Sequence, residues 1–304
     1  MDGIIPLMKP KGMTSHDCVQ RVRKIIGMKK VGHTGTLDPN VEGVLPICLG
    51  EATKTIPYLQ ELKKVYIAEI TLGTATTTED ADGEVIEQVN IERGPSDEEI
   101  ANVLQSFIGE IKQTPPMYSA VKVKGKRLYE YARENKTVER PERTVTIYDI
   151  KRIKTNNDDH NRSFTIEVSC SKGTYIRTLA VDIGKRLGYP AHMSALKRIE
   201  TDSFTIDETV TFKQIERAKE ENRLEEIILP IARALRHLPT IQVNESLKKR
   251  ILQGQKLQQP KEKVREPFLM MYGEQLLAIY QYDTKLKGKI KPVRVFNMYK
   301  SEGE

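Results

Sequence analysis

Apolar residues recur at helical spacing in several parts of the chain. In 15–26 they lie on one face, and Thr14 with Asp17 forms a capping box in front of them. The segment 96–108 begins in the same way and carries a similar apolar face. These patterns predict helices there, and further helices are expected over 56–62, 128–135, 179–187, 211–237 and 247–252.

Apolar and polar residues alternate with period two elsewhere, which predicts strands that are buried on one face. In 65–72 every second residue from Tyr66 to Leu72 is apolar, so these side chains would share one face. The segment 156–161 would form the tip of a hairpin between two such strands. Further strands are expected over 3–10, 145–153, 163–169, 268–272, 276–282 and 291–299.

Helices and strands both occur along the chain, which indicates an α+β protein; the mixed β-sheet with flanking helices is expected from the family resemblance described below. A chain of 304 residues suits one large domain and a small one. Pro239, after the last predicted helix of the first part, marks a linker. We therefore expect domains over 1–238 and 239–304, the second of them rich in strands.

Composition excludes several classes of protein. The chain contains no apolar run of transmembrane length, and its N-terminus lacks a signal-peptide pattern, which favours a cytoplasmic location. Three cysteines and five histidines show no metal-ligand spacing, and no phosphate-binding glycine motif is present. We therefore expect neither a metal nor a nucleotide cofactor. The net charge of +7 favours polyanionic partners, although weakly on its own.

Two segments carry candidate chemistry. In Gly32-His33-Thr34-Gly35-Thr36-Leu37-Asp38-Pro39, the proline disfavours the α region for Asp38, and the glycines allow close backbone approach. The loop could present the carboxylate to a ligand, or it could be an ordinary surface turn. The segment from residue 121 to residue 144 contains eight Lys or Arg but only four Glu, and two tyrosines are interleaved with them. This composition suits an RNA-binding surface or a solvated helix.

The string around Asp38 resembles the signature of the TruB family of tRNA pseudouridine synthases, in which this aspartate is catalytic. Further segments resemble other motifs of that family, in the same order along the chain. They are Lys9-Pro10-Lys11-Gly12-Met13-Thr14-Ser15, Lys64-Val65-Tyr66, Pro115-Pro116-Met117-Tyr118-Ser119-Ala120, Gly173-Thr174-Tyr175-Ile176-Arg177-Thr178 and Ala191-His192-Met193-Ser194-Ala195-Leu196-Lys197-Arg198. Position 197 is Lys where the family more often has Arg.

The resemblance implies a fold and an activity. The first domain would be a pseudouridine synthase catalytic domain with an RNA-clamping arm at about 112–145. The second would resemble a PUA domain, an RNA-binding module, although that likeness is vaguer. The protein would act as a monomer on the T-arm of tRNA and convert uridine 55 to pseudouridine by base flipping. It would break the bond to N1 and form one to C5, without a metal or an organic cofactor.

The resemblance also implies roles for individual residues. Tyr66 would lie against the target base and could help to remove the C5 proton, or it could be a core aromatic. Tyr175 and Leu196 would close the pocket, although Leu196 could be plain core. His33 could fill the space that the base vacates, or it could be a structural loop histidine. Residues expected to bind RNA are Lys54, Lys122, Lys124, Lys126 and Arg127.

Arg177 is the expected partner of Asp38. A guanidinium can fork onto a carboxylate through two parallel hydrogen bonds, and an opposite charge lowers a carboxyl pKa. We therefore expect Arg177 to keep Asp38 ionised and correctly aimed. Asp38 could attack C1′ of the ribose, add to C6 of uracil or take the C2′ proton, and the sequence leaves these three open.

Two other functions are compatible with the sequence. The chain could be a non-catalytic RNA-binding or RNA-folding protein in which Asp38 is only a turn residue. It could also be a subunit of a guide-RNA-dependent pseudouridine synthase. The modest length of the chain favours a stand-alone enzyme.

Overall fold

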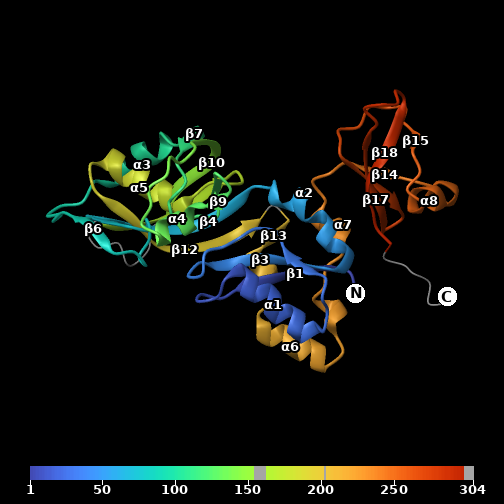
Figure 1. The fold of residues 1–304 in the computed structure, drawn as a ribbon, viewed down its shortest axis with the longest axis horizontal. Coiled ribbons are helices and arrows are strands. Elements are labelled where there is room, and N and C mark those ends of the chain that lie inside the picture. The colour runs from blue at the N-terminus through green and yellow to red at the C-terminus, as the bar shows by residue number, and fades with distance from the viewer. Residues whose placement is uncertain (154–161, 202, 298–304) are drawn as a thin grey trace.

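A computed structural model describes residues 1–153, 162–201 and 203–297. The predicted hairpin tip at 156–161 lies outside the described residues. So do residues 298 and 299, at the end of the last predicted strand. The predicted α+β class is confirmed, because the chain forms mixed sheets flanked by helices (Figure 1).

A nine-stranded sheet forms the body of the protein. Among the described strands of this sheet, β12 and β3 pair in parallel, and all other neighbouring strands are antiparallel. The main path runs β1 (Gly3–Lys9), β3 (Glu42–Leu49), β12 (Ala191–Thr201), β4 (Lys64–Leu72), β11 (Ser163–Cys170), β10 (Arg143–Ile153) and β7 (Gly109–Gln113). Outside this path, β2 (Val31–His33) pairs with β3, and β13 (Phe204–Thr205) pairs with β12.

Helices cover the sheet in two groups. Helices α1 (Ser15–Ile26) and α6 (Phe212–Glu220) pack below the β1–β3 part, whereas α3 (Asp97–Gln105) and α5 (Ile176–Leu187) pack against the β4–β10 part (Figure 1). The predicted capping boxes at the starts of α1 and α3 are both present. The helices of each group bury their apolar faces against the sheet, and the two resulting hydrophobic cores are separate.

The remaining elements of the body are short. The predicted helix at 56–62 is α2 (Ile56–Gln60), preceded by a 3-10 helix (Gly50–Thr55). The 211–237 region divides into α6, a 3-10 helix (Leu224–Glu226) and α7 (Ile231–Ala234). Two hairpins form two-stranded sheets of their own. One pairs β5 (Thr74–Thr76) with β6 (Val85–Gln88), and the other pairs β8 (Lys122–Val123) with β9 (Lys126–Arg127), which is followed by α4 (Leu128–Arg133).

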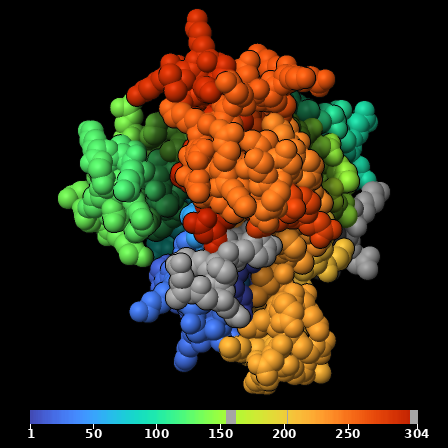
Figure 2. Space-filling view, turned by 90° about the vertical axis from the view of Figure 1, so that its right-hand side faces the viewer, coloured from blue at the N-terminus to red at the C-terminus, as the bar shows by residue number. Residues whose placement is uncertain are grey.

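The C-terminal part forms a five-stranded sheet of its own. Its order is β14 (Thr240–Gln242), β16 (Phe268–Tyr272), β17 (Gln275–Tyr282), β18 (Lys289–Val295) and β15 (Leu257–Gln258), with α8 (Glu245–Leu252) beside it. One side of this sheet has a separate core, whereas the other shares apolar contacts with α7 and β1. Figure 2 views the molecule from this end, with the orange and red C-terminal segment above the blue α1 region.

Candidate active site

A pocket of about 790 Å³ opens on the body at the centre of the nine-stranded sheet. Its walls come from the loop after β2, strand β4, the start of β10, the turn before α5 and strand β12. Segments that lie far apart in the sequence therefore meet there. The pocket is lined by five of the predicted site residues, namely Asp38, Tyr66, Tyr175, Arg177 and Leu196.

The loop that carries Asp38 is fixed from beneath by the first motif. Lys9 is fully buried, and its Nζ donates to the carbonyls of Pro39 at 2.9 Å and Val41 at 2.7 Å. On the other side of Asp38, Ser15 Oγ accepts from the Leu37 amide at 2.9 Å. Because buried ammonium and hydroxyl groups need partners, these contacts define one loop conformation.

Arg177 lies beside Asp38, but it does not fork onto that carboxylate alone. Its Nη2 is 3.0 Å from Asp38 Oδ2 and also donates to the Tyr118 carbonyl at 3.0 Å. Its Nη1 donates to the Thr78 carbonyl at 3.1 Å and lies 3.7 Å from Asp80 Oδ2. The prediction that Arg177 makes two parallel hydrogen bonds to Asp38 is therefore wrong, because a second carboxylate and two carbonyls share the guanidinium.

Arg177 lowers the pKa of Asp38, as expected, but a larger effect sets the direction of the net shift. The side chain remains 45% exposed at the pocket surface, yet the surrounding protein removes much of its hydration. This desolvation raises the pKa of Asp38 above its ordinary value, and the nearby Asp80 carboxylate adds to the rise. Arg177 and Lys9 pull the pKa down but do not outweigh desolvation.

This raised pKa predicts the acid limb of the pH profile. Each of the three roles expected for Asp38 needs its ionised form, so kcat/KM should fall as pH decreases through the raised pKa. The fall should therefore begin above the pH expected for an ordinary aspartate, whose pKa is about 3.9. Initial rates across pH would test this, with RNA binding measured in parallel as the control. A rate that stays constant down to that ordinary value would contradict the assignment.

Tyr66 is both a core aromatic and a pocket residue, which are the two alternatives that the sequence left open. It packs against the core of the β4–β10 part and also lines the pocket. Burial raises the pKa of its hydroxyl, and the positive charge of Arg198 opposes that rise. The neutral phenol is therefore the form present near neutral pH.

Arg198 is a site residue that sequence reasoning missed. It is 2% exposed, lines the pocket, and donates from Nε to the Val44 carbonyl at 2.8 Å and from Nη2 to the Gly35 carbonyl at 3.3 Å. Alternation along β12 could have revealed it, because Leu196 and Arg198 share one face. Lys197 points the other way, and its Nζ lies 3.4 Å from Glu42.

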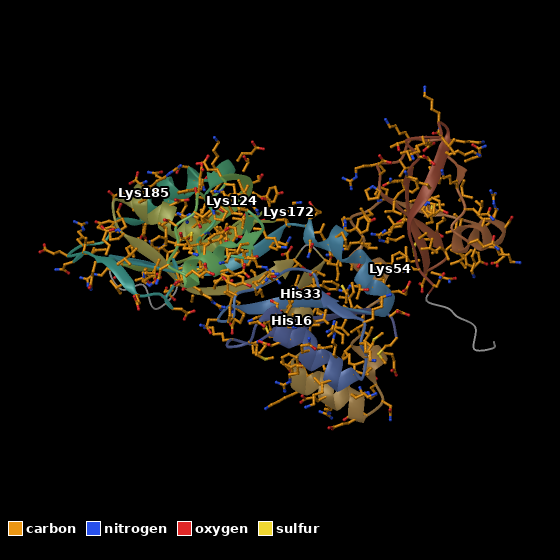
Figure 3. The ribbon with its side chains drawn as sticks, in the orientation of Figure 1. His16, His33, Lys54, Lys124, Lys172 and Lys185 are labelled. Carbon is orange, nitrogen blue, oxygen red and sulfur yellow. The ribbon has the colours of Figure 1, made fainter. Side chains whose placement is uncertain are left out.

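His33 is not one of the described residues that line this pocket. It lies in β2 opposite Ile47, and burial lowers its pKa. Its Nδ1 is buried and makes no hydrogen bond with any described residue. Figure 3 shows it above His16 of α1, and its role in filling the vacated base position stays a prediction.

The predicted RNA-binding residues lie in two different places. Lys54 forms an ion pair with Glu51 and donates to the Val295 carbonyl at 2.9 Å, which ties the body to the C-terminal sheet. The other four lie around β8 and β9, where Lys126 Nζ is 5.1 Å from the Tyr131 ring centroid. The five predicted RNA-binding residues are Lys54, Lys122, Lys124, Lys126 and Arg127. None of them is among the described residues that line the pocket.

Two further observations bear on the class of protein. No helix among the described residues is long and apolar enough to cross a membrane. Within the same residues, no three His, Cys, Asp or Glu side chains are grouped so that they could hold a metal ion.

Comparison with known proteins identifies the family. Residues 23–176 match the model of the TruB family pseudouridylate synthase N-terminal domain. Residues 177–236 match that of the tRNA pseudouridylate synthase B C-terminal domain.

Relatives match over almost the whole chain. Proteins named tRNA pseudouridine synthase B from Oceanobacillus iheyensis and Halalkalibacterium halodurans are 55% and 49% identical to it. The matches cover 97% of this chain in both cases, and 98% and 97% of those proteins.

Solved structures agree with this relationship. A chain in the crystal structure of a Cbf5-Nop10-Gar1 complex is 30% identical, with a TM-score of 0.71 over 92% of this chain and 78% of that one. A chain of an H/ACA RNP bound to a substrate RNA containing 2′-deoxyuridine is 26% identical, with a TM-score of 0.72 over 97% and 84%. The resemblance found in the sequence is thus confirmed, and the chain belongs to the TruB family of pseudouridylate synthases, which are isomerases.

Proposed function

We propose that this chain converts uridine 55 in the T-loop of tRNA to pseudouridine. The observation that carries the proposal is the pocket in which Asp38 lies beside Arg177, with Tyr66, Tyr175 and Leu196 around them. The near-full-length likeness to proteins named tRNA pseudouridine synthase B supports tRNA as the substrate. Action as a monomer is part of this proposal, and tRNA as substrate fits a cytoplasmic location.

The reaction requires the uracil to leave the stacked T-loop and enter the pocket. Tyr66 and Leu196 supply an aromatic and an apolar wall for the base. The glycosidic bond from C1′ to N1 then breaks, the uracil rotates, and C1′ bonds to C5. The C5 proton is lost and N1 regains a proton, so the product is an isomer of the substrate. Uracil is both leaving group and acceptor, so the atoms balance without a co-reactant.

Asp38 supplies the reactive carboxylate in this scheme. Attack on C1′, addition to C6 and removal of the C2′ proton all use its ionised form. Arg177 keeps a positive charge 3.0 Å from Oδ2 as the carboxylate reacts. The partly desolvated carboxylate is more basic than an ordinary aspartate, which favours each of the three steps.

Two further surfaces would hold the rest of the RNA. The arm at about 112–145 presents cations stacked on tyrosines, including Lys126 on Tyr131 and Arg127 on Tyr129. In the C-terminal part, which we propose to be a PUA-like domain, residues 240–297 hold twelve Lys or Arg and five Asp or Glu. Such a charge excess favours contact with phosphates.

Removing the charges of the arm should weaken binding without slowing the chemistry. The variant has alanine at Lys122, Lys124, Lys126 and Arg127, and its KM should rise at least about tenfold with little change in kcat. The dependence of binding on salt should also become shallower, by roughly one unit of slope for each phosphate that the arm no longer binds.

A charge-matched control carries alanine at four cations of the α6 region, which are Lys213, Arg217, Lys219 and Arg223. Its kinetics should remain close to those of the wild type. Equal behaviour of the two variants would show that the arm is not a specific RNA-binding surface.

The proposal is tested by incubating the purified chain with a bare T-arm hairpin and no other RNA. Pseudouridine at the position equivalent to 55 would support it. Product that forms only after a guide RNA is added would favour a guide-dependent subunit instead. RNA binding without any product under both conditions would favour a non-catalytic RNA-binding or RNA-folding protein.

A further inference from the structure

Gln113 occupies a core position at the end of β7. Alternation along this edge strand turns Ile111 and Gln113 inward, whereas Glu110 and Lys112 are exposed. Gln113 is 2% exposed, so its amide has almost no access to water. A buried amide is costly unless its donors and acceptor find partners.

The partner of this amide is the backbone of Tyr175. Gln113 Nε2 donates to the Tyr175 carbonyl at 3.1 Å, and the Tyr175 amide donates to Gln113 Oε1 at 3.0 Å. The side chain therefore binds one residue of backbone from both sides, as a neighbouring strand would.

The position of Tyr175 gives this pairing its significance. Tyr175 lines the pocket, and it is also the residue before α5, where its own side chain makes no capping bond. Arg177, two residues later, carries the guanidinium that contacts Asp38. Gln113 thus holds the segment from which both a pocket wall and the counter-charge project, although it is not one of the described residues that line the pocket.

We propose that Gln113 is a positioning residue for pseudouridine formation. It acts through the backbone of Tyr175, by fixing where the tyrosine ring and the start of α5 lie relative to Asp38. The proposal rests on the proposed function, which supplies both the reaction and the RNA used to measure its rate. Because small displacements at a reacting centre cost large factors in rate, losing this anchor should affect turnover more than RNA binding.

The first test is Gln113→Met, which keeps the length of the side chain and removes both hydrogen bonds. The rate at saturating T-arm RNA should fall at least about tenfold, while the RNA dissociation constant changes by less than about twofold. Gln105→Met, the same substitution at the exposed end of α3, should match the wild type in both. A wild-type rate for Gln113→Met, or equal losses of rate and binding, would overturn the proposal.

Two further measurements separate positioning from a general packing role. Hydrogen exchange at the Tyr175 amide, which needs no substrate, should be faster in Gln113→Met and unchanged in Gln105→Met. If wild-type enzyme failed to modify the RNA, the proposed function would be wrong, but this comparison would still decide on the Tyr175 anchor. Unchanged exchange at Tyr175, or equally faster exchange throughout the core, would overturn the proposal.

Gln113→Glu gives the complementary test. The ionised carboxylate can still accept from the Tyr175 amide, but it places an acceptor against the Tyr175 carbonyl. A buried carboxyl has a raised pKa, and once protonated it can donate to that carbonyl as the amide does. The rate relative to wild type should therefore rise as pH decreases from about 8 to about 6. A ratio that is constant or falls would overturn the proposal.

Discussion

Replacing Asp38 with alanine is expected to abolish pseudouridine formation and to leave folding and tRNA binding intact. The side chain is 45% exposed at the pocket, so its removal deletes little core packing. Removing a reacting group commonly costs factors of about 10⁴ to 10⁶ in turnover, so no product should be detected on the time scale of wild-type turnover. The measurement is single-turnover pseudouridine formation, together with an RNA-binding titration and thermal unfolding.

The matched control for this variant is Asp149→Ala, which removes an exposed carboxylate from β10. It should retain wild-type rates. Substantial product from Asp38→Ala would remove the carboxylate from the chemistry. A simultaneous loss of RNA binding in a folded protein would assign Asp38 a role in recognition.

Arg177→Lys is expected to have the second-largest effect, a loss of roughly 10²- to 10³-fold in turnover. The guanidinium reaches Asp38, Asp80 and two backbone carbonyls from opposite ends of a rigid plane. A single ammonium group cannot occupy both ends. It therefore leaves some of these acceptors without their partner, and it holds the positive charge less firmly beside Asp38.

Single-turnover rates of Arg177→Lys should be compared with those of Arg186→Lys, which changes an exposed arginine near the end of the same helix. The control should remain within a few-fold of wild type, since a surface arginine contributes little. Nearly normal turnover for Arg177→Lys would show that charge alone suffices and that the shared contacts are unnecessary.

Local signals in the sequence predicted the helices and strands that depend on interactions between residues close together in the chain. Helix α1 and strand β4 follow directly from capping residues and from the spacing of apolar side chains. The ends of some elements could not be predicted in this way. Helix α3, for example, stops at Gln105 instead of continuing to Ile108.

The residues brought into the pocket came mainly from the family resemblance, because Asp38 and Arg177 lie far apart in the sequence. Their environment could not be predicted from either residue alone. Asp80 enters from another loop and shares the guanidinium, and the walls of the pocket desolvate the carboxylate. Hence the direct fork was predicted wrongly, and the net rise of the Asp38 pKa through desolvation was not foreseen.

Gln113 and Arg198 escaped prediction for a related reason. Each is a polar residue at an inward position of a strand, which was the available signal. The partners that explain them are backbone groups of distant segments, namely Tyr175 for Gln113, and Gly35 with Val44 for Arg198. Such pairings depend on how the sheet brings the chain together.

The most direct test of the account is to map pseudouridine, nucleotide by nucleotide, in unmodified tRNA after incubation with wild-type protein and with Asp38→Ala. The account predicts one modified position for the wild type, uridine 55 of the T-loop, and none for the variant. Modification at other positions in place of 55, or the same product from both proteins, would contradict it.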